Sequence, residues 1–110
     1  MSITHIVLLQ FKPGADPAAV KTTCLNLLAL ATACVHPTTQ TPYIRRVTGG
    51  HDNSPEGLQH GATHGFVVEF ASAADRDYYV QSDPAHLAFV ASLKGLAEKI
   101  TVVDFTPSVF

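Results

Sequence analysis

The sequence predicts a single α+β domain over residues 1–110, with an antiparallel four-stranded sheet and helices on one of its faces, in the order β-α-β-β-α-β. Three observations predict this class. The chain has 110 residues, about the modal size of one domain. Short segments alternate apolar and polar residues as strands do. Two Asp-Pro pairs, Asp16-Pro17 and Asp83-Pro84, each mark a helix start, because Asp caps a helix and Pro fits its first turn.

The first strand is predicted over residues 3–11 and the first helix over residues 17–35. Both faces of the strand are mostly apolar, which predicts that both are covered. Apolar residues recur along one side of the helix, and His36-Pro37 ends it. Between the two elements a Pro-Gly pair marks a turn.

The later elements follow from the same signals. Alternation marks the strands, turn formers and Pro55 mark the loop, and Ser72 opens a capping box. In chain order we expect a strand over 43–48 closed by a turn at Gly49-Gly50, an exposed loop over 51–61, a strand over 63–71, a helix broken into segments over 72–80 and 84–97, and a strand over 100–105.

Such a sheet carries helices on one face and leaves the other bare. Ile6 and Leu8 point to the bare face, and 46% of the residues are apolar, an excess that a chain this short has few places to bury. Burial of the bare face by a second copy is the simplest solution. The sequence therefore predicts a homodimer.

Composition excludes several classes of function. The formal net charge is −2, so there is no basic footprint for nucleic acid. No apolar run approaches the ~20 residues that span a bilayer, and the N-terminus lacks the features of a signal peptide. We expect a cytoplasmic protein with no membrane or nucleic-acid partner.

Two cysteines, Cys24 and Cys34, fall within the first predicted helix. Ten residues of helix rise about 15 Å, which is too far for a disulfide. We expect both to be small buried apolar residues in a reducing compartment.

Three of the six histidines stand where a pocket could form. His5 and His64 share strand faces with apolar residues, and His86 begins a helix that would cover them. A buried imidazole needs a hydrogen-bond partner, at a cost of about 1–3 kcal/mol if it has none. The three are either satisfied core residues or an acid–base cluster. A metal site is the weaker reading, since their spacing matches no known metal motif.

Four stretches of the chain resemble the stress-responsive dimeric A/B barrel family. They are Thr4-His5-Ile6-Val7-Leu8-Leu9-Gln10-Phe11-Lys12, Thr63-His64-Gly65-Phe66-Val67-Val68-Glu69-Phe70, Asp83-Pro84-Ala85-His86-Leu87-Ala88-Phe89 and Val102-Val103-Asp104-Phe105-Thr106-Pro107. The resemblance implies a ferredoxin-like βαββαβ subunit that dimerises into an α+β barrel.

The resemblance also implies a function. Polyketide cyclases of this family close a linear poly-β-keto chain by an intramolecular aldol reaction and need no cofactor or metal. By resemblance, His86 is the catalytic base, Tyr78 orients the carbonyl, and His5 and His64 line the active site. The apolar residues expected to bind the substrate are Phe66, Val68, Phe89 and Leu28.

Other readings stay open. About two extra residues separate Tyr78 from the Pro-Ala-His motif, so Tyr79 could serve instead. The chain could be a non-catalytic stress-associated barrel protein that binds a small apolar ligand. It could also be a cofactor-free oxygenase or decarboxylase, because a fold alone does not determine a function.

Overall fold

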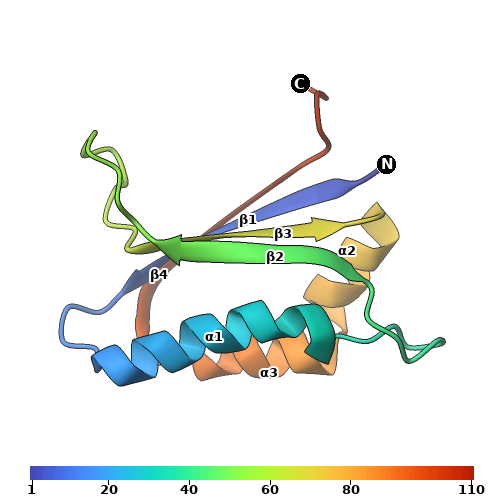
Figure 1. Ribbon diagram of the computed structural model, residues 1–110, viewed down its shortest axis with the longest axis horizontal. Coiled ribbons are helices and arrows are strands. Elements are labelled where there is room, and N and C mark those ends of the chain that lie inside the picture. The colour runs from blue at the N-terminus through green and yellow to red at the C-terminus, as the bar shows by residue number, and fades with distance from the viewer.

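The computed structural model describes residues 1–110 and has the predicted element order (Figure 1). The elements are β1 (Ile3–Phe11), α1 (Pro17–Ala33), β2 (Ile44–His51), β3 (His64–Phe70), α2 (Ala73–Gln81), α3 (Pro84–Ser92) and β4 (Ala97–Phe105). The four strands form one antiparallel sheet in the order β2-β3-β1-β4. The predicted ferredoxin-like α+β class, including the helical region broken in two, is confirmed.

Helix starts lie where the capping signals predict them. Asp16 accepts a hydrogen bond from the backbone N–H of Ala18 at 3.3 Å, and Asp83 accepts one from Ala85 at 2.9 Å, each with proline at the first helical position. Ser72 caps α2 in the same way. These caps satisfy N–H groups that have no partner within the helix.

Three predicted boundaries are wrong: the end of β2, the end of α3 and the start of β4. Gly49 and Gly50 continue β2 rather than turning the chain, and a Cβ on Gly49 would collide with the Phe66 ring and the Gly65 carbonyl. Glycine there serves close packing of β2 on β3. The last helix ends at Ser92 rather than 97, because the chain turns through Gly95 with φ +82° and β4 begins at Ala97.

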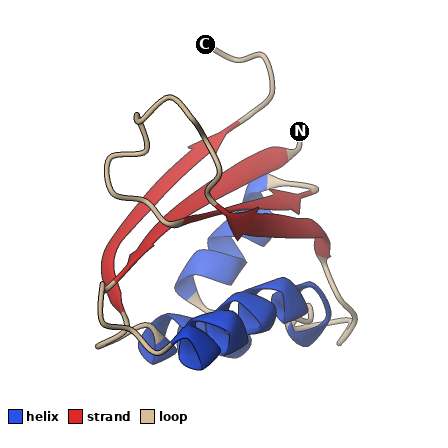
Figure 2. Cartoon of the chain, turned by 60° about the vertical axis from the view of Figure 1, so that its left-hand side comes forward, coloured by secondary structure: helices blue, strands red, loops and turns tan.

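All three helices lie on one side of the sheet (Figure 2). The core sits between them and is built from alternate residues of the strands. Its fully buried members include Leu9, Val68 and Phe70. No helix is long and apolar enough to span a membrane.

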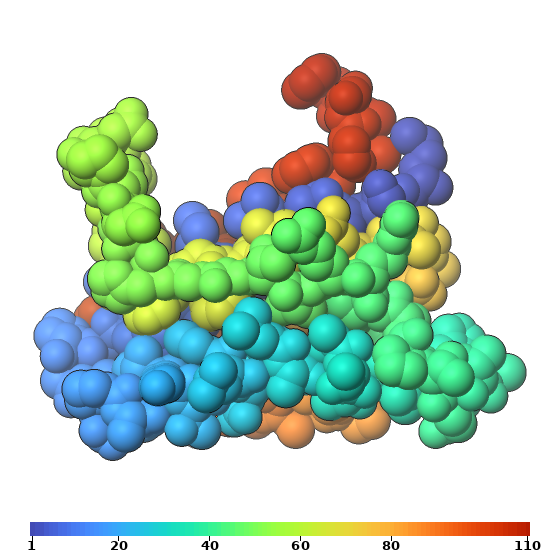
Figure 3. Space-filling model, in the orientation of Figure 1, coloured from blue at the N-terminus to red at the C-terminus, as the bar shows by residue number.

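The other face of the sheet, here called the outer face, has no helix over it. Leu8, Val103 and Phe105 on that face are 38%, 57% and 44% exposed. The loop between β2 and β3 and the tail after Phe105 both rise from this side and leave a trough between them (Figure 3). The chain thus presents a large apolar surface flanked by two projections.

Candidate functional site

A cavity of about 440 Å³ lies on the helix side of the sheet, between β4 and the pair α2 and α3. It exists because α1 packs over β2 and α2 over β3, which leaves β4 at the far edge without a helix directly above it. Its lining comes from five elements and is mainly apolar: His5, Val7, Leu27, Arg76, Asp77, Tyr79, Val80, Gln81, His86, Phe89, Val90, Leu93, Ile100, Val102 and Asp104. We call it the helix-side cavity.

A chain of charged and polar groups crosses one wall of this cavity. His5 on β1 and Asp104 on β4 are directly paired in the sheet, and His5 Nδ1 lies 2.6 Å from Asp104 Oδ1. Arg76 Nη1 donates to the other oxygen, Oδ2, at 2.9 Å, and Arg76 Nε donates to Asp77 at 2.8 Å. These hydrogen bonds, the one to Asp77 first, raise the pKa of Arg76.

The pairing with Asp104 orients the His5 ring. An ionised carboxylate only accepts hydrogen bonds, so His5 Nδ1 carries a hydrogen, and in the neutral form of the ring Nε2 has a free lone pair. The ring is nearly buried, 5% exposed, and packs edge-on against Phe70 and Tyr79. A histidine held in this way by a carboxylate is the usual construction of a general base.

His86 is built differently. It is the third residue of α3, and its ring stacks on Tyr79 with centroids 3.8 Å apart. Its Nδ1 is buried and has no hydrogen-bond partner. Burial lowers the pKa of His86. The Tyr79 backbone partly offsets this lowering, and His5 (lowering) and Asp83 (raising) have smaller effects. The ring is therefore neutral at pH 7.

Of the two candidate tyrosines, only Tyr79 lines the cavity. Tyr78 points elsewhere, packing edge-on against Tyr43 at a centroid distance of 5.7 Å. Successive residues on a helix differ by about 100° in direction, so a shift of one position changes which side chain points into the cavity. Of the two alternatives that the sequence left open, the structure places Tyr79 at the cavity and Tyr78 away from it.

Three predicted lining residues also lie outside the helix-side cavity. Phe66 and Val68 face the helices but are 2% and 0% exposed, because they are deep in the core at the centre of the sheet. Leu28 packs against the core, and its neighbour Leu27 reaches the cavity instead. Phe89 lines the cavity as expected.

His64 is on the predicted face but at the other end of the sheet. It pairs with Leu9, four residues along β1 from His5, or about 13 Å of strand. Its ring packs edge-on against Phe11 and His51, each at 5.0 Å, and its Nδ1 lies 2.9 Å from Thr63 Oγ1. Burial, then His51, lower its pKa. His64 is thus separated from His5 and His86.

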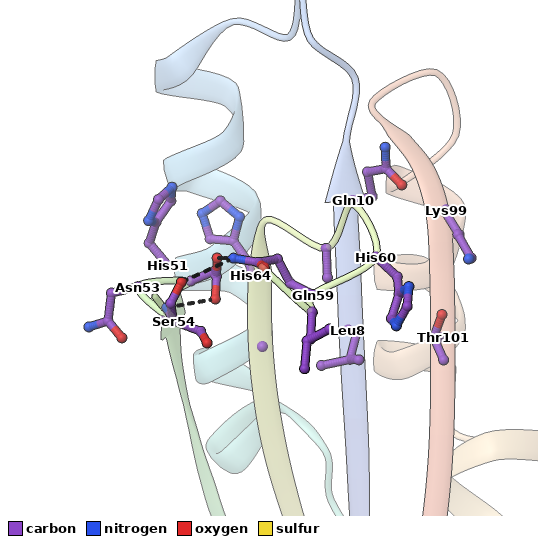
Figure 4. Close-up of a pocket in the computed structure, with 15 residues that line it drawn as sticks. Leu8, Gln10, His51, Asn53, Ser54, Gln59, His60, His64, Lys99 and Thr101 are labelled. Atoms are coloured by element: carbon purple, nitrogen blue, oxygen red, sulfur yellow. Dashed lines mark hydrogen bonds between the residues drawn. The ribbon is translucent and has the colours of Figure 1, made fainter. Parts of the chain in front are cut away.

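A second cavity, of about 660 Å³, opens beneath the β2–β3 loop (Figure 4). Its floor includes the paired glycines Gly50 and Gly65, which put no side chains on the outer face. Asp52 holds the loop by accepting from the Ser54 N–H and the Gln59 side chain. No three histidine, cysteine or acidic side chains anywhere in the chain are arranged to bind a metal ion.

A buried polar cluster stands behind Tyr79. The Tyr43 hydroxyl donates to Asp83 at 2.6 Å, and Cys34 lies beside both. Burial, followed by Asp83, raises the pKa of Cys34 to about 12, so the thiol stays protonated and unreactive. Cys24 and Cys34 are both free; Cys34 is buried as predicted, whereas Cys24 is only partly buried. This cluster joins the C-terminal cap of α1, the residue before β2 and the N-terminal cap of α3 behind the site.

Comparison with known proteins places this geometry in a family. The model of the stress responsive A/B barrel domain matches residues 3–107. The chain belongs to this family. A curated relative, the stress-response A/B barrel domain-containing protein HS1 of Arabidopsis thaliana, is 27% identical over 106 residues, which cover 96% of this chain and 90% of HS1.

Solved structures with this fold include two enzymes. A hydroxynitrile lyase from Passiflora edulis is 23% identical, with a TM-score of 0.83 over 99% of this chain and 96% of the lyase. SnoaB, a cofactor-independent oxygenase from Streptomyces nogalater, is 13% identical, with a TM-score of 0.69 over 99% and 95%. Three further structures of this fold are described as dimeric ferredoxin-like proteins. Catalysis is therefore compatible with the fold.

Sequence reasoning missed Asp104, Arg76 and Asp77 as members of the site. The signal for Asp104 was present, since alternation over the last strand puts it on the same face as Ile100 and Val102. An acidic residue among apolar strand neighbours calls for a partner. Arg76 and Asp77 lie in a polar stretch of helix, where charged residues are ordinarily solvated.

Proposed function

We propose that the chain is a cofactor-independent acid–base enzyme of the lyase or cyclase type, acting on a small carbonyl compound in the helix-side cavity. One observation carries this: His5, oriented by Asp104, and a neutral His86 line the same mainly apolar cavity. A carbon between two carbonyls is acidic enough for an imidazole near neutral pH, so the reaction needs no metal or cofactor.

In this mechanism His5 is the base. Its Nε2 removes a proton from the carbon next to a carbonyl, and Asp104 stabilises the imidazolium that forms. The carbanion attacks a second carbonyl carbon, a C–C bond forms, and the imidazolium returns the proton to the new alkoxide. The poly-β-keto cyclisation is the forward reaction of this kind. A lyase runs the same steps in reverse, breaking the bond.

In this proposal His86 donates a hydrogen bond to the substrate carbonyl and is not the base. The Tyr79 backbone raises the pKa of His86 but makes no hydrogen bond to Nδ1, and a buried unpaired acceptor is better tolerated than an unpaired donor. This proposal therefore assigns the hydrogen to Nε2. A neutral imidazole near a helix N-terminus can then donate to a carbonyl oxygen as charge develops on it. This exchanges the roles that the family resemblance implied, because the carboxylate is paired with His5.

The experiment uses a generic 1,3-diketone. The protein should accelerate keto–enol equilibration of 1-phenylbutane-1,3-dione, followed by ultraviolet absorbance, well beyond the same concentration of free imidazole. His5→Asn should lower this acceleration by ~10²–10⁴, the usual worth of a general base. His51→Asn, at the other end of the sheet, is the matched control and should have no effect. No acceleration by the wild-type protein would refute the proposal.

A non-catalytic role is the second candidate, since most of the cavity lining is apolar. A binder of small apolar molecules would bind the diketone without changing its rate of enolisation, and His5→Asn would leave both unchanged. Measuring binding and enolisation on the same samples separates the two functions.

The homodimer belongs to the same proposal. The outer face exposes Leu8, Val103 and Phe105, a contiguous apolar surface that favours burial against a partner. The dimeric structures of this fold support a second copy of the chain as that partner. A sedimentation mass of one chain at micromolar concentration would contradict it.

A further inference from the structure

Three charged side chains line the helix-side cavity: Arg76, Asp77 and Asp104. They carry one positive and two negative charges, and His86 is neutral. Counted without His5, these side chains give the cavity a net charge of −1. An ion entering from water would meet this charge inside a mainly apolar enclosure, where electrostatic effects exceed those in water.

Arg76, the only positively charged side chain among the three, already binds two carboxylates of the protein. Arg76 donates from Nε to Asp77 and from Nη1 to Asp104, at 2.8 Å and 2.9 Å. Both oxygens of Asp104 are in turn occupied, one by Arg76 and one by His5. A guanidinium usually binds carboxylates through two parallel hydrogen bonds. Here those hydrogen bonds go to the protein's own carboxylates.

From this network we infer that the site selects neutral carbonyl compounds over carboxylates, and that Asp77 is a specificity-determining residue because it occupies Arg76. The inference rests on the proposed function, and it names the substrate class of that site. Asp104 is needed to orient His5, whereas the only side-chain hydrogen bond of Asp77 is the one from Arg76. Its role is therefore separable from that of the base.

The same charge that excludes an anion suits a neutral substrate. When His5 takes a proton it becomes positive, and the network changes from −1 to zero. The negative charge of Asp104 stabilises that imidazolium, while the substrate becomes a carbanion. A substrate that enters as a carboxylate would start beside a net negative charge and become a dianion on deprotonation.

The test compares two probes of nearly equal shape. 4-Phenylbutan-2-one is a neutral methyl ketone, and 3-phenylpropanoate has a carboxylate where the ketone has an acetyl group. Dissociation constants are measured by NMR titration on the wild-type dimer, Asp77→Asn, and Asp75→Asn as the control. Asp75 is on α2 but does not line the cavity. Asp77 is half exposed, so Asp77→Asn should fold normally.

We expect the wild-type protein to bind the ketone at least tenfold more tightly than the carboxylate. An apolar cavity disfavours any anion, so the wild-type preference alone does not test the role of Asp77. The comparison with Asp77→Asn tests it. Asp77→Asn should improve carboxylate binding three- to tenfold and leave ketone binding within twofold, and the gain should shrink in high salt. Asp75→Asn should match the wild type.

An unchanged ratio in Asp77→Asn, or a wild-type preference for the carboxylate, would overturn the inference, as would failure of both probes to bind. Because these are binding measurements, they are independent of the proposed reaction. If the ratio shifts as expected but His5→Asn leaves diketone enolisation unchanged, the specificity stands and the acid–base function fails.

Discussion

The two ends of the sheet each carry a pair of histidines, and the two pairs differ in their partners. At one end His5 is held by Asp104, and His86 has a buried nitrogen with no partner. At the other end His51 and His64 pack on one another, while the nearby Asp52 holds the loop. The residue type is the same. A carboxylate partner and an apolar enclosure make only the first pair suitable for proton transfer.

The largest effect is expected from adjacent residues on opposite faces of β4. Val103 lies on the outer face, and Val102 lines the helix-side cavity. Val103→Asp should convert the dimer into a monomer, because it puts a charge into the proposed interface. Val102→Asp should keep the dimer mass and abolish binding of 4-phenylbutan-2-one. Sedimentation and NMR titration give both results, and a dimeric Val103→Asp would place the interface elsewhere.

The second largest effect is expected on activity, which should respond to a substitution in one histidine pair and not in the other. His86→Gln should lower the rate of diketone enolisation by ~10-fold or more, since it removes a hydrogen bond that develops in the transition state. His64→Gln should change it by less than twofold, because His64 is at the far end of the sheet. Equal losses in the two variants would mean that both act through stability rather than chemistry.

The third effect is a dependence of stability on pH. The folded-state pKa of His86 is below the ordinary histidine value of 6.5, so between these two pKa values the unfolded chain binds more protons. Stability therefore falls as the pH drops through about 6.5 toward the folded pKa. His64 contributes in the same direction.

Melting temperatures at pH 7.5 and pH 5.0 test this. The wild-type protein should melt at a lower temperature at pH 5.0, and His86→Gln should reduce the difference between the two pH values more than His64→Gln. A wild-type protein that is more stable at pH 5.0 would contradict the lowered pKa values.

The smallest effect concerns the adjacent tyrosines. Tyr79 supports the ring of His86, whereas Tyr78 packs on Tyr43. Tyr79→Leu should weaken ketone binding several-fold by removing that support. Tyr78→Leu should leave the dissociation constant within twofold. The opposite order would put Tyr78 in the site after all.

The sequence predicted the fold well because local signals determine it. The Asp-Pro helix starts and the strand alternation are short-range features, and each lies where it was expected. Local signals do not determine how residues on neighbouring strands are positioned relative to one another. Alternation put His5 and His64 on one face correctly, yet their separation depends on the register of β1 and β3, which pairing across the sheet determines.

The pairing of His5 with Asp104 could not be predicted from the sequence for the same reason. It requires β4 to lie beside β1 with those two residues opposite each other, although 99 residues separate them in the chain. The choice between Tyr78 and Tyr79 was open because the face that α2 turns toward the cavity depends on how the helix packs on the sheet. Such long-range registers depend on tertiary packing rather than on local pattern.

The most direct test of the account is the tautomer of His5. Nitrogen NMR should show that the neutral form of His5 carries its hydrogen on Nδ1 and has Nε2 unprotonated. Asp104→Asn should change that tautomer population and, in the same sample, slow diketone enolisation. A His5 ring with the hydrogen on Nε2 in the wild-type protein, or an Asp104→Asn variant with an unchanged tautomer and rate, would contradict the assignment of His5 as the base.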